Sequence, residues 1–274
     1  MTVPLGQKVG AGRVAEVFLY GDTDVIKLSR VPGPPAVFEA EAAAQRAAAA
    51  SGLRVPEVRG IQEVDGRPGL VMARLDGIDG LTAAERQPWR IWSIGRATGK
   101  LHRELARTPA PAGLKNLKDR LRHDIGQSRR VPERARGRVL SLLEAAPDGD
   151  RLCHGDFHPG NVIETPEGPV IIDFSGASSG DPLADHVNAL IILSAGAPPP
   201  GLSRRERMLI AVGRDLFAAA YRSGYRAAGP VDDASARRWK PVIVARRLSE
   251  GIPEERNSLL RMLSRSLREA EAQP

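Results

Sequence analysis

Short runs of alternating apolar and polar residues dominate the chain up to about residue 73, and this pattern predicts β-strands. Turn residues such as Gly-Asp-Thr-Asp at 21–24 separate the runs. An Ala-rich stretch at 36–51 has the composition of a helix, which Gly52 would end. We therefore expect an antiparallel sheet with one inserted helix. Its strands would cover residues 5–9, 15–20, 25–28, 57–63 and 69–73.

Beyond Gly77 the apolar positions recur with the spacing of amphipathic helices. In the stretch 90–105, for example, Ile94, Thr98 and Leu101 fall on one stripe. Strands first and helices later predict an α+β fold, with residues 1–75 and 76–274 as two lobes and the active site where they meet. Further helices are expected at 114–125, 132–146, 183–193, 204–222, 234–248 and 253–272.

Composition narrows the class of protein. A chain of 274 residues with 42% hydrophobic content can build a substantial core. The chain has 34 arginines and six lysines against 33 Asp and Glu, a net charge of +7. The arginines interleave with Glu as on solvated helix faces, which disfavours nucleic acid as a partner. The single cysteine, Cys153, fits a reducing compartment. Without a signal-peptide pattern or a membrane-spanning run, we expect a cytoplasmic protein with no membrane partner. The oligomeric state is not indicated.

The groups suited to chemistry gather in the run Cys-His-Gly-Asp-Phe-His-Pro-Gly-Asn at 153–161 and in the aspartate that follows an apolar stretch. These are Asp156, Asn161 and Asp173. Protein-kinase-type catalysis needs an Asp that orients and deprotonates a hydroxyl, plus an Asn and a second Asp that hold magnesium. The spacing His-x-Asp-x-x-x-x-Asn is that of the kinase catalytic loop. We predict a phosphotransferase with Asp156 as the base and Asn161 and Asp173 as magnesium ligands.

A lysine and a glycine turn in the first lobe fit the same chemistry. Lys27 lies in the middle of an expected strand, fifteen residues after Gly12, where it would contact nucleotide phosphates. Its carboxylate partner would be Glu41 or Glu39. Positions two apart differ by about 200° on a helix, so one of the two faces Lys27, and we favour Glu41. Gly10 and Gly12 would allow the hairpin backbone to close over the phosphates.

Two other nucleotide-binding loops are disfavoured. A dinucleotide-binding loop requires a helix after the glycines, whereas residues 17–20 predict a strand. A Walker loop would have to lie at 95–100, which is one spacer too short, and Leu101 stands where Ser or Thr is required.

The two histidines of the run, His154 and His158, admit a different interpretation. With Asp156 and Asp173 they resemble the ligands of a metal-dependent phosphoesterase. That function would leave Lys27 without a role. We interpret both histidines as residues that fix the loop by hydrogen bonds.

Taken together, these motifs resemble those of the aminoglycoside phosphotransferase family, relatives of protein kinases that phosphorylate small molecules. The resemblance extends from about Gly10 to Asp185. Protein kinases instead carry Arg after the catalytic-loop His, and Ser175 stands where they have the Gly of Asp-Phe-Gly. The motifs concerned are His-Gly-Asp-x-His-x-Gly-Asn at 154–161, Ile-Asp-Phe at 172–174, Gly-Asp-Pro-x-x-Asp at 180–185 and Gly-x-x-x-Gly-x-Leu-His at 95–102.

The resemblance implies a bilobal protein-kinase-like fold with ATP or GTP in the cleft and magnesium on Asn161 and Asp173. It implies that the backbone of Ala73 and Leu75 binds the edge of the nucleobase. Asp181 would either help to order the loop or touch the substrate.

The acceptor is then a small hydroxylated molecule, and its charge is the main clue. From residue 183 onward the chain has 15 Lys and Arg against 10 Asp and Glu, and a basic surface repels a polycation. An aminoglycoside is therefore no more favoured than another antibiotic, a sugar, an amino alcohol or a nucleoside. We expect a small-molecule O-kinase, acting in antibiotic resistance or in metabolism. A non-catalytic nucleotide-binding regulator is the less favoured alternative.

Overall fold

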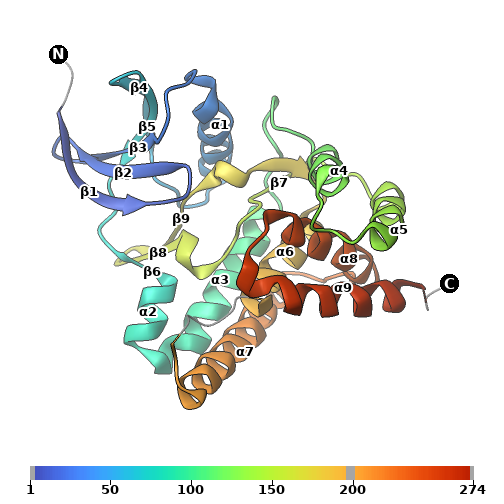
Figure 1. Ribbon diagram of the computed structural model, residues 1–274. Coiled ribbons are helices and arrows are strands. Elements are labelled where there is room, and N and C mark those ends of the chain that lie inside the picture. Colours follow the sequence, from blue (N-terminus) through green and yellow to red (C-terminus); the bar gives the residue numbers. More distant parts are fainter. Residues whose placement is uncertain (1–3, 196–200, 272–274) are drawn as a thin grey trace.

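The computed structural model describes residues 4–195 and 201–271 (Figure 1). Within these residues an N-terminal antiparallel sheet with one helix precedes a larger, mainly helical part, so the predicted α+β fold is confirmed. Figure 1 shows the sheet at the upper left and the helices below and to the right. No helix in this part of the chain is long and apolar enough to cross a membrane.

The five strands described in the N-terminal lobe are ordered β1-β2-β3-β5-β4. Helix α1 (Ala36–Ala50) covers one face, where Phe38 and Ala42 pack with Leu70 and Met72. The strand bounds are β1 Leu5–Ala11, β2 Ala15–Tyr20, β3 Asp24–Ser29, β4 Val58–Val64 and β5 Arg67–Ala73.

Alternation along β3 decides where its lysine points. Ile26 and Leu28 are fully buried on the face of the sheet opposite α1, in contact with Val71. Successive side chains of a strand point to opposite faces, so Lys27 lies on the α1 face, paired across the sheet with Leu70. The strand therefore holds an ammonium group beneath a helix instead of in solvent.

The C-terminal lobe contains two small sheets and a set of longer helices. The first sheet joins β6 (Ile78–Asp79), β8 (Val162–Thr165) and β9 (Gly168–Ile171); the second joins β7 (Arg151–Cys153) and β10 (Ser178–Gly180). The helices are α2 Gly80–Arg86, α3 Ile91–Leu105, α4 Leu117–Gln127, α5 Glu133–Ala145, α6 Pro182–Ala195, α7 Arg204–Ala227, α8 Asp233–Glu250 and α9 Arg256–Glu271.

Several helix boundaries differ from the prediction for identifiable reasons. Helix α4 begins at Leu117, not residue 114, because the side chain of Asn116 caps it by accepting from the N–H groups of Lys118 and Asp119.

Helix α2 was not predicted. It has seven residues and begins at a capping aspartate, Asp79.

Helix α1 also joins the two lobes. Its residues Ala44 and Ala48 belong to a second cluster that contains Phe157 and Phe174 from the C-terminal lobe. The backbone N–H of Ile171 donates to the carbonyl of Arg54, shortly after α1, at 3.0 Å. One helix thus packs on the sheet with one side and on the loops of the second lobe with the other.

The glycine spacing at 95–102 produces a close contact between α3 and α7. A methyl group built on Gly99 would overlap the carbonyl oxygen of Tyr221, and one on Gly224 would overlap the carbonyl oxygen of Arg96. The backbones of these two helices therefore approach each other where Ala would not fit.

Replacement of Gly99 by Ala should lower the free energy of unfolding by about 3 kcal/mol, because backbone atoms cannot move aside as a side chain can. Chemical denaturation followed by circular dichroism measures the effect. Gly137→Ala is the matched control: it lies in α5 with nothing within 4 Å and should stabilise the protein by up to about 1 kcal/mol. Equal effects of the two substitutions would contradict the packing argument.

Candidate active site

Lys27 forms two short ion pairs, one within the N-terminal lobe and one to the C-terminal lobe. Its Nζ lies 2.7 Å from Oε1 of Glu41 and 2.7 Å from Oδ1 of Asp173. Lys27 and Glu41 are buried, whereas Glu39, the alternative partner, is exposed on α1. Burial alone would lower the pKa of Lys27, but the two carboxylates outweigh burial and raise it. The ammonium group therefore stays charged at the base of the cleft.

Asp173 owes its position to an unusual backbone. Its φ of 62° and ψ of 69° are left-handed, which is uncommon outside Gly, Asn and Asp. Its Oδ1 also accepts from the N–H of Ser175 at 3.3 Å, at the start of the short 3₁₀ helix Phe174–Gly176. Burial would raise the pKa of this carboxyl, yet Lys27 holds it at about 2. Oδ1 is thus committed to protein donors, and the second carboxylate oxygen is left for a ligand.

The loop that carries Asp156 follows β7 and is held from below by α6. Asp185 accepts two backbone hydrogen bonds, from His154 to Oδ2 at 2.7 Å and from Gly155 to Oδ1 at 2.8 Å. The side chain of Asn188 donates to the carbonyl of Gly155 at 2.8 Å. Asp185 and Asn188 share a face of α6, since they are three residues apart. Their side chains satisfy three backbone groups of the loop.

Asp185 and Asn188 were absent from the predicted site residues. A signal for Asp185 existed, because it ends the Gly-Asp-Pro-x-x-Asp motif at 180–185. Asp185 also contacts His102, the last residue of the motif at 95–102, with 3.0 Å between Oδ2 and Nε2. Burial would raise the pKa of Asp185, but the hydrogen bonds from His102 and the loop lower it to about 2. The buried carboxylate of Asp185 therefore holds the backbone of the loop in place.

His154 uses both ring nitrogens within the loop. Its Nε2 donates to the carbonyl of Ile172 at 3.0 Å, and its Nδ1 accepts from the N–H of Asp156 at 3.3 Å. This pattern needs the neutral ring, and burial lowers its pKa accordingly. His158 accepts from the N–H of Gly160 through Nδ1 at 3.1 Å and directs Nε2 toward the Asp156 carboxylate, 3.7 Å away. Neither ring is arranged as part of a dinuclear metal centre.

Asp156 is the carboxylate at the tip of this loop. Burial would raise its pKa, but the neighbouring His158 outweighs burial, with smaller contributions from His154 and Arg247, and lowers it. The carboxylate is therefore ionised at neutral pH and can accept a proton. Its side chain is about half exposed, which leaves it open to a ligand in the cleft.

Asn161 connects Asp156 to Asp173. Its Nδ2 donates to the carbonyl of Asp156 at 2.8 Å, and its own carbonyl accepts from the N–H of Ile172 at 3.0 Å. With Nδ2 committed, Oδ1 is the atom of the amide that is left for a ligand. Amide and carboxylate oxygens suit a hard cation that completes its shell with water and phosphate oxygens. The donor set of Asn161 and Asp173 thus fits magnesium.

The glycine turn has a simpler geometry than expected. Gly10 pairs with Val17 in the β1–β2 ladder, and the N–H of Gly12 donates to the carbonyl of Ala15 at 2.8 Å. Neither Gly10 nor Gly12 has the positive φ that requires glycine, and a methyl group on either would make ordinary contacts at 3.5–3.6 Å. Special dihedrals therefore do not explain these glycines. Their role in closing the hairpin over phosphates stays a prediction.

The segment that joins the lobes begins at Ala73. Its N–H donates to the carbonyl of Glu57 at 2.9 Å, and the N–H of Arg74 donates to that of Thr23 at 2.9 Å. Ala73 can therefore offer a nucleobase its carbonyl but not its N–H. Leu75, two residues on, is half-buried at the same segment.

Asp181 is committed to the C-terminal lobe. Its Oδ1 accepts from the N–H of Leu183 at 2.9 Å at the start of α6, and its Oδ2 accepts from Nε1 of Trp239 in α8 at 2.7 Å. Of the two roles considered for Asp181, ordering the chain after the loop accounts for both carboxylate oxygens.

Comparison with protein families decides the class. The sequence model of the phosphotransferase enzyme family, APH, matches residues 6–234. The chain belongs to this family. It is accordingly a phosphotransferase, and the predicted resemblance is confirmed. Comparison with curated protein sequences gives no significant match.

Solved structures share the fold of this APH-family chain at low sequence identity. A choline/ethanolamine kinase family protein from Mesorhizobium loti has 20% identity and a TM-score of 0.60, with 98% of this chain and 87% of that one covered. An amicoumacin kinase in complex with AMP-PNP, Ca²⁺ and Ami has 15% identity and a TM-score of 0.63, covering 97% and 88%. The GDP and kanamycin complex of an aminoglycoside phosphotransferase has 18% identity and a TM-score of 0.58, covering 99% and 94%. The bilobal kinase-like fold is thereby confirmed.

Replacement of Asp185 by Asn should lower the free energy of unfolding at pH 7 by about 2–3 kcal/mol. This is the stabilisation that corresponds to a pKa of about 2 in the folded protein against about 3.9 in the unfolded chain. Because the folded pKa is depressed, this stability is present above pH 4 and is lost as the pH falls through 2. The difference between wild type and variant should therefore shrink between pH 5 and pH 2. Urea unfolding at several pH values measures it.

Asp76→Asn is the control for the pH series, because Asp76 is almost fully exposed on the segment between the lobes. Its difference from wild type should be close to zero at every pH. A pH-independent effect of Asp185→Asn would contradict the role of its charge.

Proposed function

We propose that the protein transfers the γ-phosphoryl group of ATP or GTP to a hydroxyl group of a small molecule. The observation that carries the proposal is the ion-pair network of Lys27, Glu41 and Asp173. Asn161 links the loop of Asp156 to Ile172, the residue before Asp173. A lysine fixed by two carboxylates, a magnesium-type donor pair and an ionised aspartate are the parts that kinase-type phosphoryl transfer requires.

In the proposed mechanism the first lobe positions the nucleotide. The ammonium group of Lys27, buried and held by Glu41, supplies a fixed positive charge for the phosphates. The turn at Gly10 and Gly12 lies over the phosphates, and the carbonyl of Ala73 with the N–H of Leu75 meets the nucleobase edge. Such positioning contributes most of the catalysis, because the transition state is loose and needs little covalent assistance.

The second lobe positions the acceptor. The acceptor oxygen forms a bond to the γ-phosphorus while the bond from that phosphorus to the β,γ-bridging oxygen breaks and ADP or GDP leaves. Asp156 orients the hydroxyl and accepts its proton, which it can do because it is ionised. Magnesium held by Asn161 and Asp173 would neutralise charge on the phosphates. His154 and His158 keep the loop in place and do not react.

The acceptor class is open to hydroxylated molecules of several kinds. Structures of similar fold include an amicoumacin kinase, a choline/ethanolamine kinase family protein and a kanamycin complex, so the fold alone does not select among antibiotics and metabolites. The acceptor with the highest kcat/KM would distinguish a role in antibiotic resistance from a role in metabolism.

Replacement of Asp156 by Asn should lower kcat about 10²–10⁴-fold for every acceptor, because the group that takes the hydroxyl proton is lost. The measurement is a coupled assay of ADP and GDP formation with magnesium and a panel of antibiotics, sugars, amino alcohols and nucleosides. Undiminished turnover in the variant would sink the assignment. Nucleotide binding by the wild type with no turnover of any acceptor would favour a non-catalytic regulator.

Replacement of Lys27 by Met should lower kcat/KM about 10²–10³-fold through loss of the fixed charge at the phosphates. Because this change leaves Glu41 buried without its partner, the double variant Lys27→Met/Glu41→Gln is the better test, and circular dichroism should show it folded. Lys8→Met, on exposed β1, is the matched control and should retain activity. A folded double variant with wild-type kcat/KM would contradict the proposed role.

A further inference from the structure

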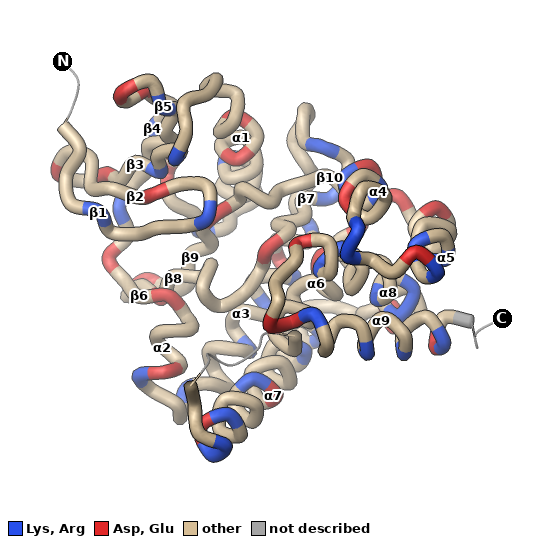
Figure 2. Tube along the Cα trace, viewed as in Figure 1, with Lys and Arg blue, Asp and Glu red and all other residues tan. Residues whose placement is uncertain are grey.

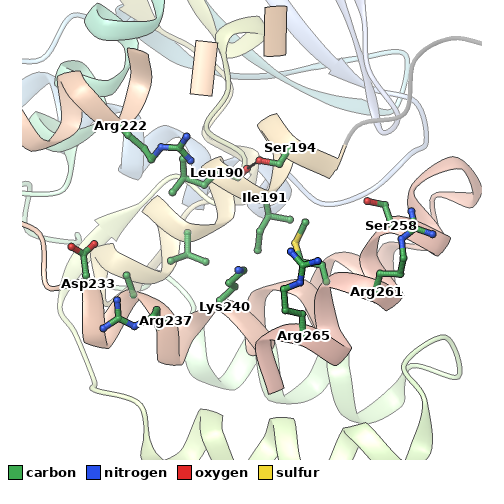
Figure 3. Close-up of a pocket in the computed structure, with 13 residues that line it drawn as sticks. Leu190, Ile191, Ser194, Arg222, Asp233, Arg237, Lys240, Ser258, Arg261 and Arg265 are labelled. Carbon is green, nitrogen blue, oxygen red and sulfur yellow. Dashed lines mark hydrogen bonds between the residues drawn. The ribbon is translucent and has the colours of Figure 1, made fainter. Parts of the chain in front are cut away.

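A cavity of about 470 Å³ lies between α6, α7, α8 and α9, apart from the Lys27 network (Figure 3). Its volume is in the range of small-molecule sites. Part of its lining is apolar: Val187, Leu190 and Ile191 from α6, Ala236 from α8 and Met262 from α9. The cavity can therefore accept the hydrophobic body of a ligand.

The polar lining of the cavity is strongly basic. Among the described residues that line it, the acidic one, Asp233, is paired with Arg226, which is not part of the lining. Lys240 has a long ion pair with Glu269, 3.6 Å, and the described structure gives the four arginines of the lining no hydrogen bond or ion pair. The basic side chains are Arg222, Arg237, Lys240, Arg261 and Arg265.

Three acids on or next to α8 are occupied away from the cavity. Glu250 and Glu255 pair with Arg246 and Arg247 at the other end of α8. Asp232 caps the start of α8. Figure 2 shows basic positions along α9, and in Figure 3 the charged ends of Lys240 and Arg265 extend toward α6. In the described part of the chain, five basic side chains line this hollow against one acidic side chain, and this excess of positive charge attracts anions and repels cations.

The same two helices that line the cavity also support the catalytic loop. Helix α6 carries Asp185 and Asn188, which hold the loop, and helix α8 carries Arg247, whose charge acts on Asp156. Lys240 precedes Arg247 by seven residues, which is about 10 Å along the helix axis. The cavity and the catalytic loop therefore share two supporting helices and lie about two turns of α8 apart.

We propose that this cavity binds the anionic part of the acceptor. The acceptor would be a hydroxylated small molecule with a carboxylate or phosphate group on an apolar body, because the lining combines apolar and basic side chains. This inference rests on the proposed function and adds the substrate class. The transfer step is unchanged, since the anionic group takes no part in bond making. Polycationic aminoglycosides would be poor acceptors, because the lining repels them.

Binding is tested first, without turnover. Isothermal titration with phenyl phosphate, which combines an apolar ring with an anion, should give a Kd at least tenfold weaker in Arg261→Gln/Arg265→Gln than in the wild type. Arg256→Gln/Arg268→Gln removes the same charge from exposed positions of α9 outside the cavity and should bind as the wild type does. Benzyl alcohol, the neutral probe, should bind weakly to all three proteins.

Turnover is tested with pairs of hydroxylated compounds that differ only by a carboxylate. The anionic member should be the better acceptor, and the cavity variant should raise its KM at least tenfold with kcat changed less than twofold. Equal phenyl phosphate binding by cavity and control variants would overturn the inference, as would a preference for polycationic acceptors. Cavity-dependent binding of phenyl phosphate with no turnover of any compound would support the anion site and contradict the proposed function.

Discussion

The ion pairs of Lys27 with Glu41 and Asp173 are the constraint on which the arrangement of this molecule depends. The three charges come from a strand, the helix that follows it and a loop 146 residues after Lys27, and they meet where the lobes meet. A buried ammonium group without partners would be costly, so β3, α1 and the chain at Asp173 must be placed correctly at the same time. Because desolvation offsets their attraction, these ion pairs add little to the free energy of unfolding. They do specify the relative position of the lobes.

The catalytic loop depends on a second buried charge in the same manner. Asp185 receives two backbone donors of the loop and His102, whose ring stacks on Phe157 with 4.0 Å between the ring centroids. Within the loop, His154, His158 and Asn161 form hydrogen bonds to backbone groups. Helix α6 adds the contacts of Asp185 and Asn188 from below, so Asp156 is kept in place by other side chains.

Sequence reasoning located most of this site because the chemistry constrains residue type and spacing. Alternation along β3 indicated a strand, but not that Lys27 points beneath α1, which depends on where α1 packs. Asp185 was part of a recognised motif, but its role was not predicted because it acts through backbone groups of the loop. Asn188 lies outside the motifs and acts in the same way. The glycines at 10 and 12 invited an argument from dihedrals that the hairpin does not need. Helix α2 is too short to give a periodic signal.

The basic character of the second lobe has a physical meaning that the overall charge does not reveal. Most arginines of the chain lie on solvated faces, where salt and water screen them. At the hollow between α6, α7, α8 and α9, four exposed arginines and Lys240 border an apolar floor, so their positive potentials add at one place. An enzyme of this fold that served polycations would place carboxylates at such a surface. Here Glu250 and Glu255 pair with Arg246 and Arg247 and Asp232 caps α8 instead, so in the proposed site the arginines of the hollow select the acceptor by its charge.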